Sequence, residues 1–214
     1  MTRALFIVDV QNDFTEGGAL GVTGGDAVAA GVSRLLAAHA GDYALIVASR
    51  DWHDPESDNG GHFAAGEPDF VDTWPVHCVA GTAGAEYDPE LVTDAVTHHV
   101  KKGQGIPAYS LFEGTTDAGE RVAELLTAHG VTDVDVTGIA TDYCVRASAR
   151  DAIEHGLHVR ILTDLVAGVA ADSSQAALAE LAHAGAELAT APRAAGESAG
   201  GADAAGDADS AGTE

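Results

Sequence analysis

The stretch Ala4-Leu5-Phe6-Ile7-Val8-Asp9-Val10 opens the pattern that decides the fold. It is a short apolar run that a carboxylate interrupts, and short apolar runs rich in β-branched residues recur along the chain after it. Such runs are typical of buried strands. The strands that they predict are Ala4–Val10, Tyr43–Ser49, Thr97–Lys101, Thr132–Ile139, Leu157–Thr163 and Glu187–Thr190.

Helical patterns separate these runs. Apolar residues recur at helical spacing between residues 28 and 36, 118 and 126, and 177 and 182, and a fourth helix is expected from about Asp142 to His155, with Gly156 as its C-terminal stop. Strands that alternate with helices indicate a parallel sheet covered by helices. We therefore predict an α/β protein with a three-layer α/β/α architecture and a mostly parallel central sheet.

The stretch from Asp51 to about Pro89 breaks this rhythm. It carries glycine, proline, aspartate, histidine and both tryptophans without regular periodicity. A loop this long inside a compact domain is usually functional or disordered, and its aromatic and histidine content favours function.

The length of 214 residues predicts one domain with a substantial core. After Pro192 the composition shifts to alanine, glycine, serine and aspartate, which cannot bury enough apolar surface to fold. We expect a folded domain over residues 1–192 and a disordered acidic tail over 193–214.

The charge excludes several classes of partner. With 34 acidic and 10 basic residues the formal net charge is -24, so no basic patch is available for nucleic acid or for an anionic membrane surface. Eight of the bases are arginine, and the two lysines are the neighbours Lys101 and Lys102. An acidic, lysine-poor composition leads us to hypothesise solubility in concentrated salt. The oligomeric state stays open.

No apolar run approaches the roughly 18 residues of a membrane span, and the first run ends at Asp9, too early for the apolar region of a signal peptide. A cytoplasmic location is the default expectation. The two cysteines, Cys78 and Cys144, do not form a secreted disulfide framework and leave thiol chemistry open.

Three polar groups are predicted at the carboxyl edge of the sheet, where ligands of open α/β sheets bind. Asp9 follows the first strand, where a carboxylate can do acid–base work or cap a turn. Lys101 and Lys102 end the third, and only one of them can readily enter the crevice because successive side chains point to opposite faces. Cys144 lies where a strand gives way to a helix. There, helix N–H groups would lower the pKa of its thiol and could hold an oxyanion. The alternative is that Cys144 is a small buried apolar residue.

The long loop offers candidate metal ligands. Asp51 and His53 lie two residues apart, and His62 and His77 follow in the same loop. One carboxylate with two or three imidazoles suits a divalent transition metal such as zinc, iron or manganese, with positions left for water or substrate. The alternative is an exposed polar loop with scattered histidines.

Taken together, these segments resemble the nicotinamidase/pyrazinamidase branch of the isochorismatase-like cysteine hydrolases. The resemblance covers roughly residues 3–190. It rests on the number, order and spacing of motifs: Asp9-Val10-Gln11-Asn12-Asp13-Phe14, Asp51-Trp52-His53, Gly61-His62-Phe63, Trp74-Pro75-Val76-His77-Cys78, Lys102-Gly103, Ala108-Tyr109-Ser110, Phe112-Glu113-Gly114 and Gly138-Ile139-Ala140-Thr141-Asp142-Tyr143-Cys144-Val145.

The resemblance implies an isochorismatase-like hydrolase fold and roles for individual residues. It implies a catalytic triad of Asp9, Lys102 and Cys144, and an oxyanion hole formed by the N–H groups of Ala140 and Cys144 next to a cis Ile139–Ala140 peptide. Phe14, Trp74 and Tyr109 match positions that wall an aromatic substrate. One divalent metal ion is implied at Asp51, His53 and His62, with His77 as a further candidate.

The implied activity is hydrolysis of nicotinamide, and of pyrazinamide, to the acid and ammonia through a cysteine thioester, in NAD salvage. Two alternatives remain at this point. One is another hydrolase of the superfamily that acts on isochorismate or a carbamoyl compound. The other is a catalytically silent metal- or ligand-binding module that keeps the fold.

Overall fold

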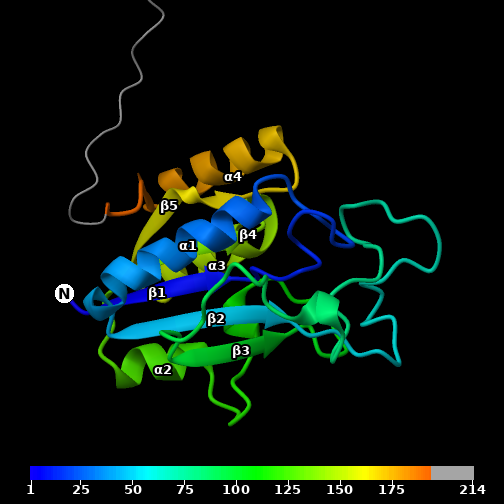
Figure 1. Cartoon of the computed structure of the whole chain (residues 1–214), viewed down its shortest axis with the longest axis horizontal. Coiled ribbons are helices and arrows are strands. Elements are labelled where there is room, and N and C mark those ends of the chain that lie inside the picture. Colours follow the sequence, from blue (N-terminus) through cyan, green and yellow to red (C-terminus); the bar gives the residue numbers. More distant parts are fainter. Residues whose placement is uncertain (194–214) are drawn as a thin grey trace, which may run out of the picture.

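Every strand of the central sheet runs parallel to its neighbours. The computed structural model describes residues 1–193, and within them the strand order is β3-β2-β1-β4-β5-β6 (Figure 1). All six predicted strands are present, with ends shifted by a few residues. They are β1 (Arg3–Val8), β2 (Leu45–Asp51), β3 (His98–Lys102), β4 (Asp133–Ile139), β5 (His158–Ala167) and β6 (Glu187–Ala189).

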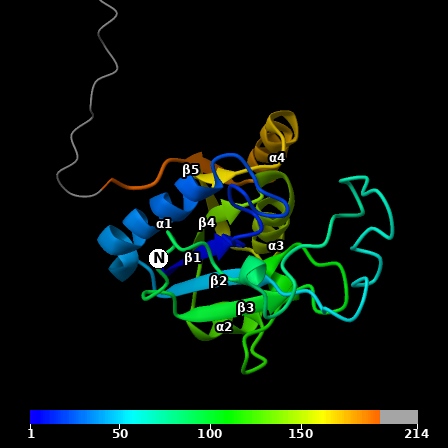
Figure 2. The ribbon, with the colours of Figure 1, turned by 45° about the vertical axis from the view of Figure 1, so that its right-hand side comes forward.

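Helices cover both faces of the sheet, which confirms the predicted three-layer architecture (Figure 2). The long helices are α1 (Gly25–His39), α2 (Val122–Ala128), α3 (Arg146–Glu154) and α4 (Ala171–His183). Short 3-10 turns lie at η1 (Ala40–Asp42), η2 (Ala83–Ala85) and η3 (Leu111–Glu113), and a π-helical turn lies at η4 (Thr141–Val145).

The alternation of side chains along the strands divides the core in two. In β1, Leu5 and Ile7 pack with α1, whereas Phe6 and Val8 pack with α2, α3 and α4 on the opposite face. Successive strand residues point to opposite faces, so an apolar run without alternation fits a strand that is buried on both sides.

Three predicted boundaries were wrong. The first strand ends at Val8 because Asp9 adopts a left-handed backbone conformation with φ of 48°. The second helix begins at Val122, so residues 118–121 are not helical. The helix predicted from Asp142 begins instead as η4, in which the Ala140 carbonyl accepts from the N–H groups of both Tyr143 and Val145, and α3 begins at Arg146.

The strand order creates a crevice at the carboxyl end of the sheet. The chain proceeds from β1 to β2 and β3 on one side, and then crosses to β4 on the other side of β1, so the order reverses between β1 and β4. Ligands of open α/β sheets bind at such a switch point. Gly138 allows the two strands to meet there, because a Cβ on it would lie 2.0 Å from the Val8 carbonyl oxygen.

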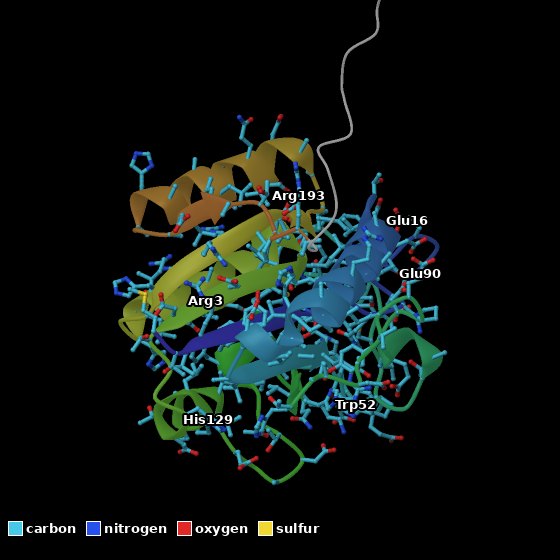
Figure 3. The ribbon with its side chains drawn as sticks, turned by 60° about the vertical axis from the view of Figure 1, so that its left-hand side comes forward. Arg3, Glu16, Trp52, Glu90, His129 and Arg193 are labelled. Atoms are coloured by element: carbon cyan, nitrogen blue, oxygen red, sulfur yellow. The ribbon has the colours of Figure 1, made fainter. Side chains whose placement is uncertain are left out.

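An arginine–aspartate network closes the opposite end of the sheet. The buried carboxylate of Asp135 accepts from Arg3 at 2.5 Å, from Arg160 at 2.7 and 2.9 Å and from the Tyr43 hydroxyl at 2.9 Å. Arg3 begins β1 and Trp52 follows β2, and the two lie on opposite sides of the molecule in Figure 3. This network is therefore remote from the crevice.

No helix within residues 1–193 has the length and apolar character that crossing a bilayer requires. Apart from Arg193, the predicted disordered tail of residues 193–214 lies outside the described residues. The division into a domain of residues 1–192 and a tail stays a prediction.

Candidate active site

The ends of three strands bring Asp9, Lys102 and Cys144 together. Asp9 follows β1, Lys102 is the last residue of β3, and Cys144 lies in η4 directly after β4. All three are buried, with exposed fractions of 0%, 1% and 6%. The structure thus places the three predicted crevice residues side by side, although Asp9 and Cys144 are 135 positions apart in the sequence.

The ammonium group of Lys102 lies at the centre of this cluster. Its Nζ is 2.9 Å from Asp9 Oδ2 and 3.6 Å from Cys144 Sγ, and it donates to Asp51 Oδ1. Asp9 Oδ1 accepts from the Ser49 hydroxyl at 2.7 Å. One buried cation therefore contacts two buried carboxylates and the thiol, and it occupies the position that a metal ion among those three groups would need.

Burial sets the protonation of the cluster. It raises the pKa of Asp9, and it disfavours charge on Lys102, yet the nearby Asp51 and Asp9 carboxylates raise the pKa of Lys102 well above its usual value. The pKa of the Cys144 thiol is also well above its usual value, because burial and the two carboxylates outweigh the favourable charge of Lys102. The expectation that helix N–H groups lower the Cys144 pKa was therefore wrong.

The two neighbouring lysines have separate environments. Lys101 points away from the crevice: its Nζ lies 4.6 Å from the centre of the Trp52 ring and 2.8 Å from Asp117.

Gly103, which follows Lys102, has a φ of 77°, and a Cβ on it would lie 2.7 Å from the His53 ring. Only glycine fits between Lys102 and that imidazole, which explains the Lys-Gly pair.

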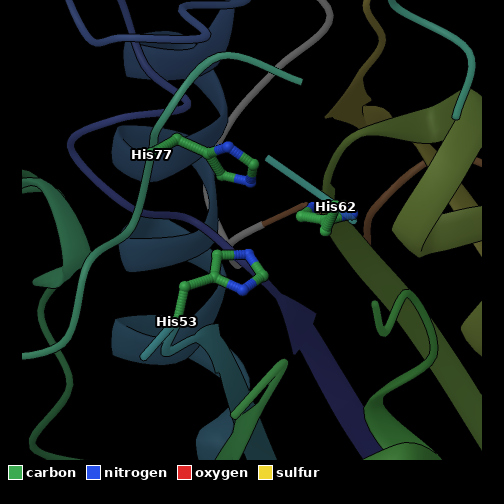
Figure 4. Close-up of side chains that lie close together, drawn as sticks. All are labelled: His53, His62 and His77. Atoms are coloured by element: carbon green, nitrogen blue, oxygen red, sulfur yellow. The ribbon is translucent and has the colours of Figure 1, made fainter. Parts of the chain in front are cut away.

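Three histidines of the long loop converge beside this cluster (Figure 4). His53, His62 and His77 are buried, and each offers a nitrogen within 4.8 Å of those of the other two. The Gly103 carbonyl lies next to His53 Nδ1, and the Pro75 carbonyl lies next to His77 Nδ1. The Nε2 atoms of these two rings can therefore point to a common position. The predicted alternative of scattered, exposed histidines is wrong.

The chemistry of this donor set fits a divalent transition metal. Within residues 1–193, the buried His53 Nε2 and His62 Nδ1 have no hydrogen-bond partner. Burial, with the charges of His53 and His77, lowers the pKa of His62 to about 4, and burial also lowers that of His77. Imidazoles that stay neutral at pH 7 keep the lone pair that a metal ligand needs.

Asp51 joins the two clusters. Its Oδ1 accepts from Lys102, while Oδ2 lies 3.8 Å from His53 Nε2 and 3.9 Å from His77 Nε2. The carboxylate can therefore face a cation at the histidines with one oxygen and Lys102 with the other. Lys102 and the two histidines hold its pKa well below the usual value against the effect of burial.

A cavity of about 420 Å³ opens directly onto these groups. Cys144 and Ala140 line it, as do Asp51, His62 and His77, whereas Asp9, Lys102 and His53 lie behind its wall. The three predicted aromatic residues also line it: Phe14 packs 5.5 Å from the His77 ring, and Trp74 Nε1 donates to the Tyr109 hydroxyl at 3.2 Å. The Ile139–Ala140 peptide is cis, as expected.

Several further residues support the site, although the sequence analysis assigned no role to any of them. The Gln11 side chain bonds to both the carbonyl and the N–H of Asp51, at 2.9 and 2.8 Å, and so fixes the main chain of a candidate ligand. Asp13 accepts from the Cys78 N–H at 2.6 Å. Tyr143 and Phe70 line the cavity. Gln11, Asp13 and Tyr143 lie in motifs that carry the family resemblance, but the sequence does not indicate their partners, and the partner of Gln11 is 40 positions away.

The whole fold has close relatives. The family model of the isochorismatase domain matches residues 3–193. The nicotinamidase/pyrazinamidase of Mycobacterium tuberculosis is 51% identical over 186 residues, which cover 87% of this chain and 97% of that protein.

Two solved structures share the architecture. The pyrazinamidase of Pyrococcus horikoshii in complex with zinc has a TM-score of 0.75 at 39% identity, covering 89% of this chain and 99% of that one. PnC1 of L. infantum in complex with nicotinate has a TM-score of 0.76 at 35% identity, covering 88% and 92%. The family model matches almost all described residues, and one relative is identical at half of the aligned positions. The chain therefore belongs to the isochorismatase domain family.

Proposed function

We propose that this protein is a nicotinamidase that hydrolyses nicotinamide, and also pyrazinamide, to the corresponding acid and ammonia in NAD salvage. The observation that carries the proposal is the cavity that the Cys144 thiol, two buried histidines and the aromatic side chains of Phe14, Trp74 and Tyr109 line, with the third histidine of the cluster behind its wall. The relatives named above, a nicotinamidase/pyrazinamidase at 51% identity and a structure with nicotinate, support the same substrate.

In this mechanism Asp9 is the base that accepts the proton of Cys144. The two side chains offer atoms within 4.8 Å of each other, and the Lys102 ammonium contacts both. Because burial raises the pKa of Asp9 as well as that of the thiol, the carboxylate is a stronger base than an exposed one. Lys102 stabilises the thiolate once the proton has moved.

The thiolate then attacks the amide carbonyl carbon, and the N–H groups of Ala140 and Cys144 receive the developing oxyanion. Asp9 returns its proton to the amide nitrogen, so ammonia leaves and a thioester to Cys144 remains. Asp9 next takes a proton from water, whose oxygen attacks the thioester carbonyl. The thiolate leaves as the acid is released, and Asp9 passes the proton taken from water to the Cys144 sulfur.

The aromatic residues and the metal site orient the substrate. Phe14, Trp74 and Tyr109 wall the cavity, so a flat heteroaromatic ring can pack between them. Asp51, His53, His62 and His77 would hold one divalent ion, and zinc, iron and manganese suit these donors. When bound, the ion supplies a Lewis-acid contact for the ring nitrogen. The packing of the ring between these aromatic side chains orients the amide toward Cys144.

An ammonia-release assay tests the proposal. The purified protein should release ammonia from nicotinamide and from pyrazinamide, and activity should fall after chelation and return with zinc, iron or manganese. Release from isochorismate-type or carbamoyl substrates in place of nicotinamide would assign the chain to another branch of the family. Binding of nicotinamide without release would identify a silent binding module.

Replacing His53 with alanine tests the metal site. Metal content should fall from about one ion per chain to a small fraction of that, and KM for nicotinamide should rise by about tenfold or more while the thiol chemistry remains. Metal analysis and steady-state kinetics measure the two effects. His99→Ala is the control, because that side chain is exposed and, within residues 1–193, its ring makes a single hydrogen bond, between Nδ1 and the Tyr87 hydroxyl at 3.0 Å. Normal metal content in His53→Ala would overturn the ligand assignment.

A further inference from the structure

A short strap covers one side of the cavity. We define it as residues 69–74, which lie in the loops beyond the carboxyl ends of the strands (Figure 1). Phe70 and Trp74 of this strap line the cavity. Its far end is fixed to the loop below it, because the Trp74 N–H donates to the His62 carbonyl at 2.9 Å and the Trp74 carbonyl accepts from Ala64 at 2.9 Å.

The tip of the strap is organised by its own first residue. The Asp69 carboxylate accepts from the main-chain N–H groups of Val71, Asp72 and Thr73 at 2.9 to 3.0 Å. The Phe70 N–H donates to the Thr73 carbonyl at 3.1 Å. These bonds give the tip a defined shape, but all of them lie inside the strap and none fixes it to the rest of the fold.

Tyr143 supplies the external attachment. Its hydroxyl donates to the Phe70 carbonyl at 3.1 Å, and within residues 1–193 this is the sole hydrogen bond that joins residues 69–73 to another segment. The Tyr143 ring also packs edge-on against Trp74, with centroids 4.9 Å apart and planes at 90°. Tyr143 lies in η4 beside Cys144, so the same turn that carries the thiol holds the strap.

The bond from Tyr143 reaches the strap at Phe70, whose backbone conformation needs support. Its backbone φ is 57°, a left-handed conformation that is rare for a bulky residue and persists only where its surroundings hold it. Half of its surface is exposed, and Val71 is more exposed still, so apolar burial holds the tip weakly. The bonds inside the strap, the edge-on contact of Phe70 with the Trp74 ring at 6.3 Å and the Tyr143 hydroxyl maintain this backbone.

We propose that Tyr143 is a positioning residue, whose hydroxyl fixes the strap so that Phe70 and Trp74 form a preorganised wall for the aromatic substrate. The proposal rests on the proposed function for the identity of that substrate. A preformed wall favours binding because less conformational freedom is lost when the ring enters. Tyr143 acts here through the strap and takes no part in proton transfer at Cys144.

Tyr143→Phe removes only the oxygen that makes the bond. We expect KM for nicotinamide to rise about three- to tenfold, the effect of losing one ordinary hydrogen bond, with kcat within about twofold of the wild type. Tyr43→Phe is the matched control, since it removes a tyrosine hydroxyl bonded to Asp135 at the far end of the sheet, and its KM should not change. An unchanged KM in Tyr143→Phe, or an equal loss in kcat, would overturn the proposal.

A double-mutant cycle separates action through the strap from direct contact with the substrate. Asp69→Ala loosens the tip from within, so adding Tyr143→Phe to it should change KM by less than about twofold. Full additivity of the two effects would mean that the hydroxyl acts independently of the strap, and would contradict the proposal.

A measurement without substrate tests the attachment of the strap independently of the proposed activity. In a Trp52→Phe background Trp74 is the single tryptophan, and its side chain is 4% exposed. Acrylamide quenching of its fluorescence should at least double in Tyr143→Phe and stay constant in Tyr43→Phe. Unchanged quenching in Tyr143→Phe would overturn the strap attachment. Increased quenching in a protein that does not hydrolyse nicotinamide would overturn the proposed function and still support the strap.

Discussion

Replacing Cys144 with alanine should lower nicotinamide hydrolysis by about 10⁴-fold or more, because none of the other cavity-lining side chains within residues 1–193 can form the thioester. The three-histidine set does not include the thiol, so metal content should stay at the wild-type level. Ammonia release and metal analysis of the same preparation measure both. The variant therefore distinguishes loss of the nucleophile from loss of the metal.

Cys78→Ala is the matched control for this experiment. The Cys78 thiol is buried but does not line the cavity, and its nearest hydrogen-bond partner is the Gly84 carbonyl at 4.0 Å. Removing it should leave turnover within a few-fold of the wild type. If Cys144→Ala retained more than about 1% of activity, or if both variants were equally inactive, Cys144 would not be the nucleophile.

Replacing Lys102 with methionine should lower both activity and stability. The variant keeps the volume but leaves the Asp9 and Asp51 carboxylates buried without their cation. Breaking a buried ion pair in this way costs about 3–5 kcal/mol of unfolding free energy. Turnover should fall by about 10³-fold, since nothing then stabilises the thiolate. Urea unfolding and ammonia release measure the two effects.

The stability loss in Lys102→Met should depend on pH. Burial already raises the pKa of Asp9, and removal of the ammonium raises it further, so the folded state binds a proton that the unfolded state has lost. Stability then falls as pH rises, and the deficit of the variant should be larger at pH 8 than at pH 5. A deficit that does not change with pH would contradict the placement of Lys102 between these carboxylates.

Lys101→Met provides a control at the neighbouring position. It also removes one lysine charge, but from an ammonium group that lies on the Trp52 ring and pairs with Asp117 at the surface. Its effect on unfolding should be clearly smaller than that of Lys102→Met and should not increase with pH, and its turnover should remain close to the wild-type value. Equal effects of the two substitutions would argue against a special role for Lys102.

The amino-acid sequence by itself determined the fold class. Runs such as Ala4–Val8 are apolar at every position because helices cover both faces of the sheet, and this pattern is local, so periodicity alone reports it. The sequence also placed Asp9, Lys102 and Cys144 at strand ends. The predictions of an acidic tail and of a composition suited to concentrated salt stay predictions.

The tertiary structure alone decided how these groups act on one another. Strand order brings the ends of β1, β3 and β4 to a single crevice, and that order depends on contacts between residues more than 100 positions apart. Burial of Cys144 beside two carboxylates reverses the pKa shift that its helix would produce. The contacts of Asp51 with both Lys102 and the histidines, and of Tyr143 with Phe70, likewise join distant segments. Local patterns report which residues are buried, whereas charges and hydrogen bonds between distant segments exist only once the chain has folded.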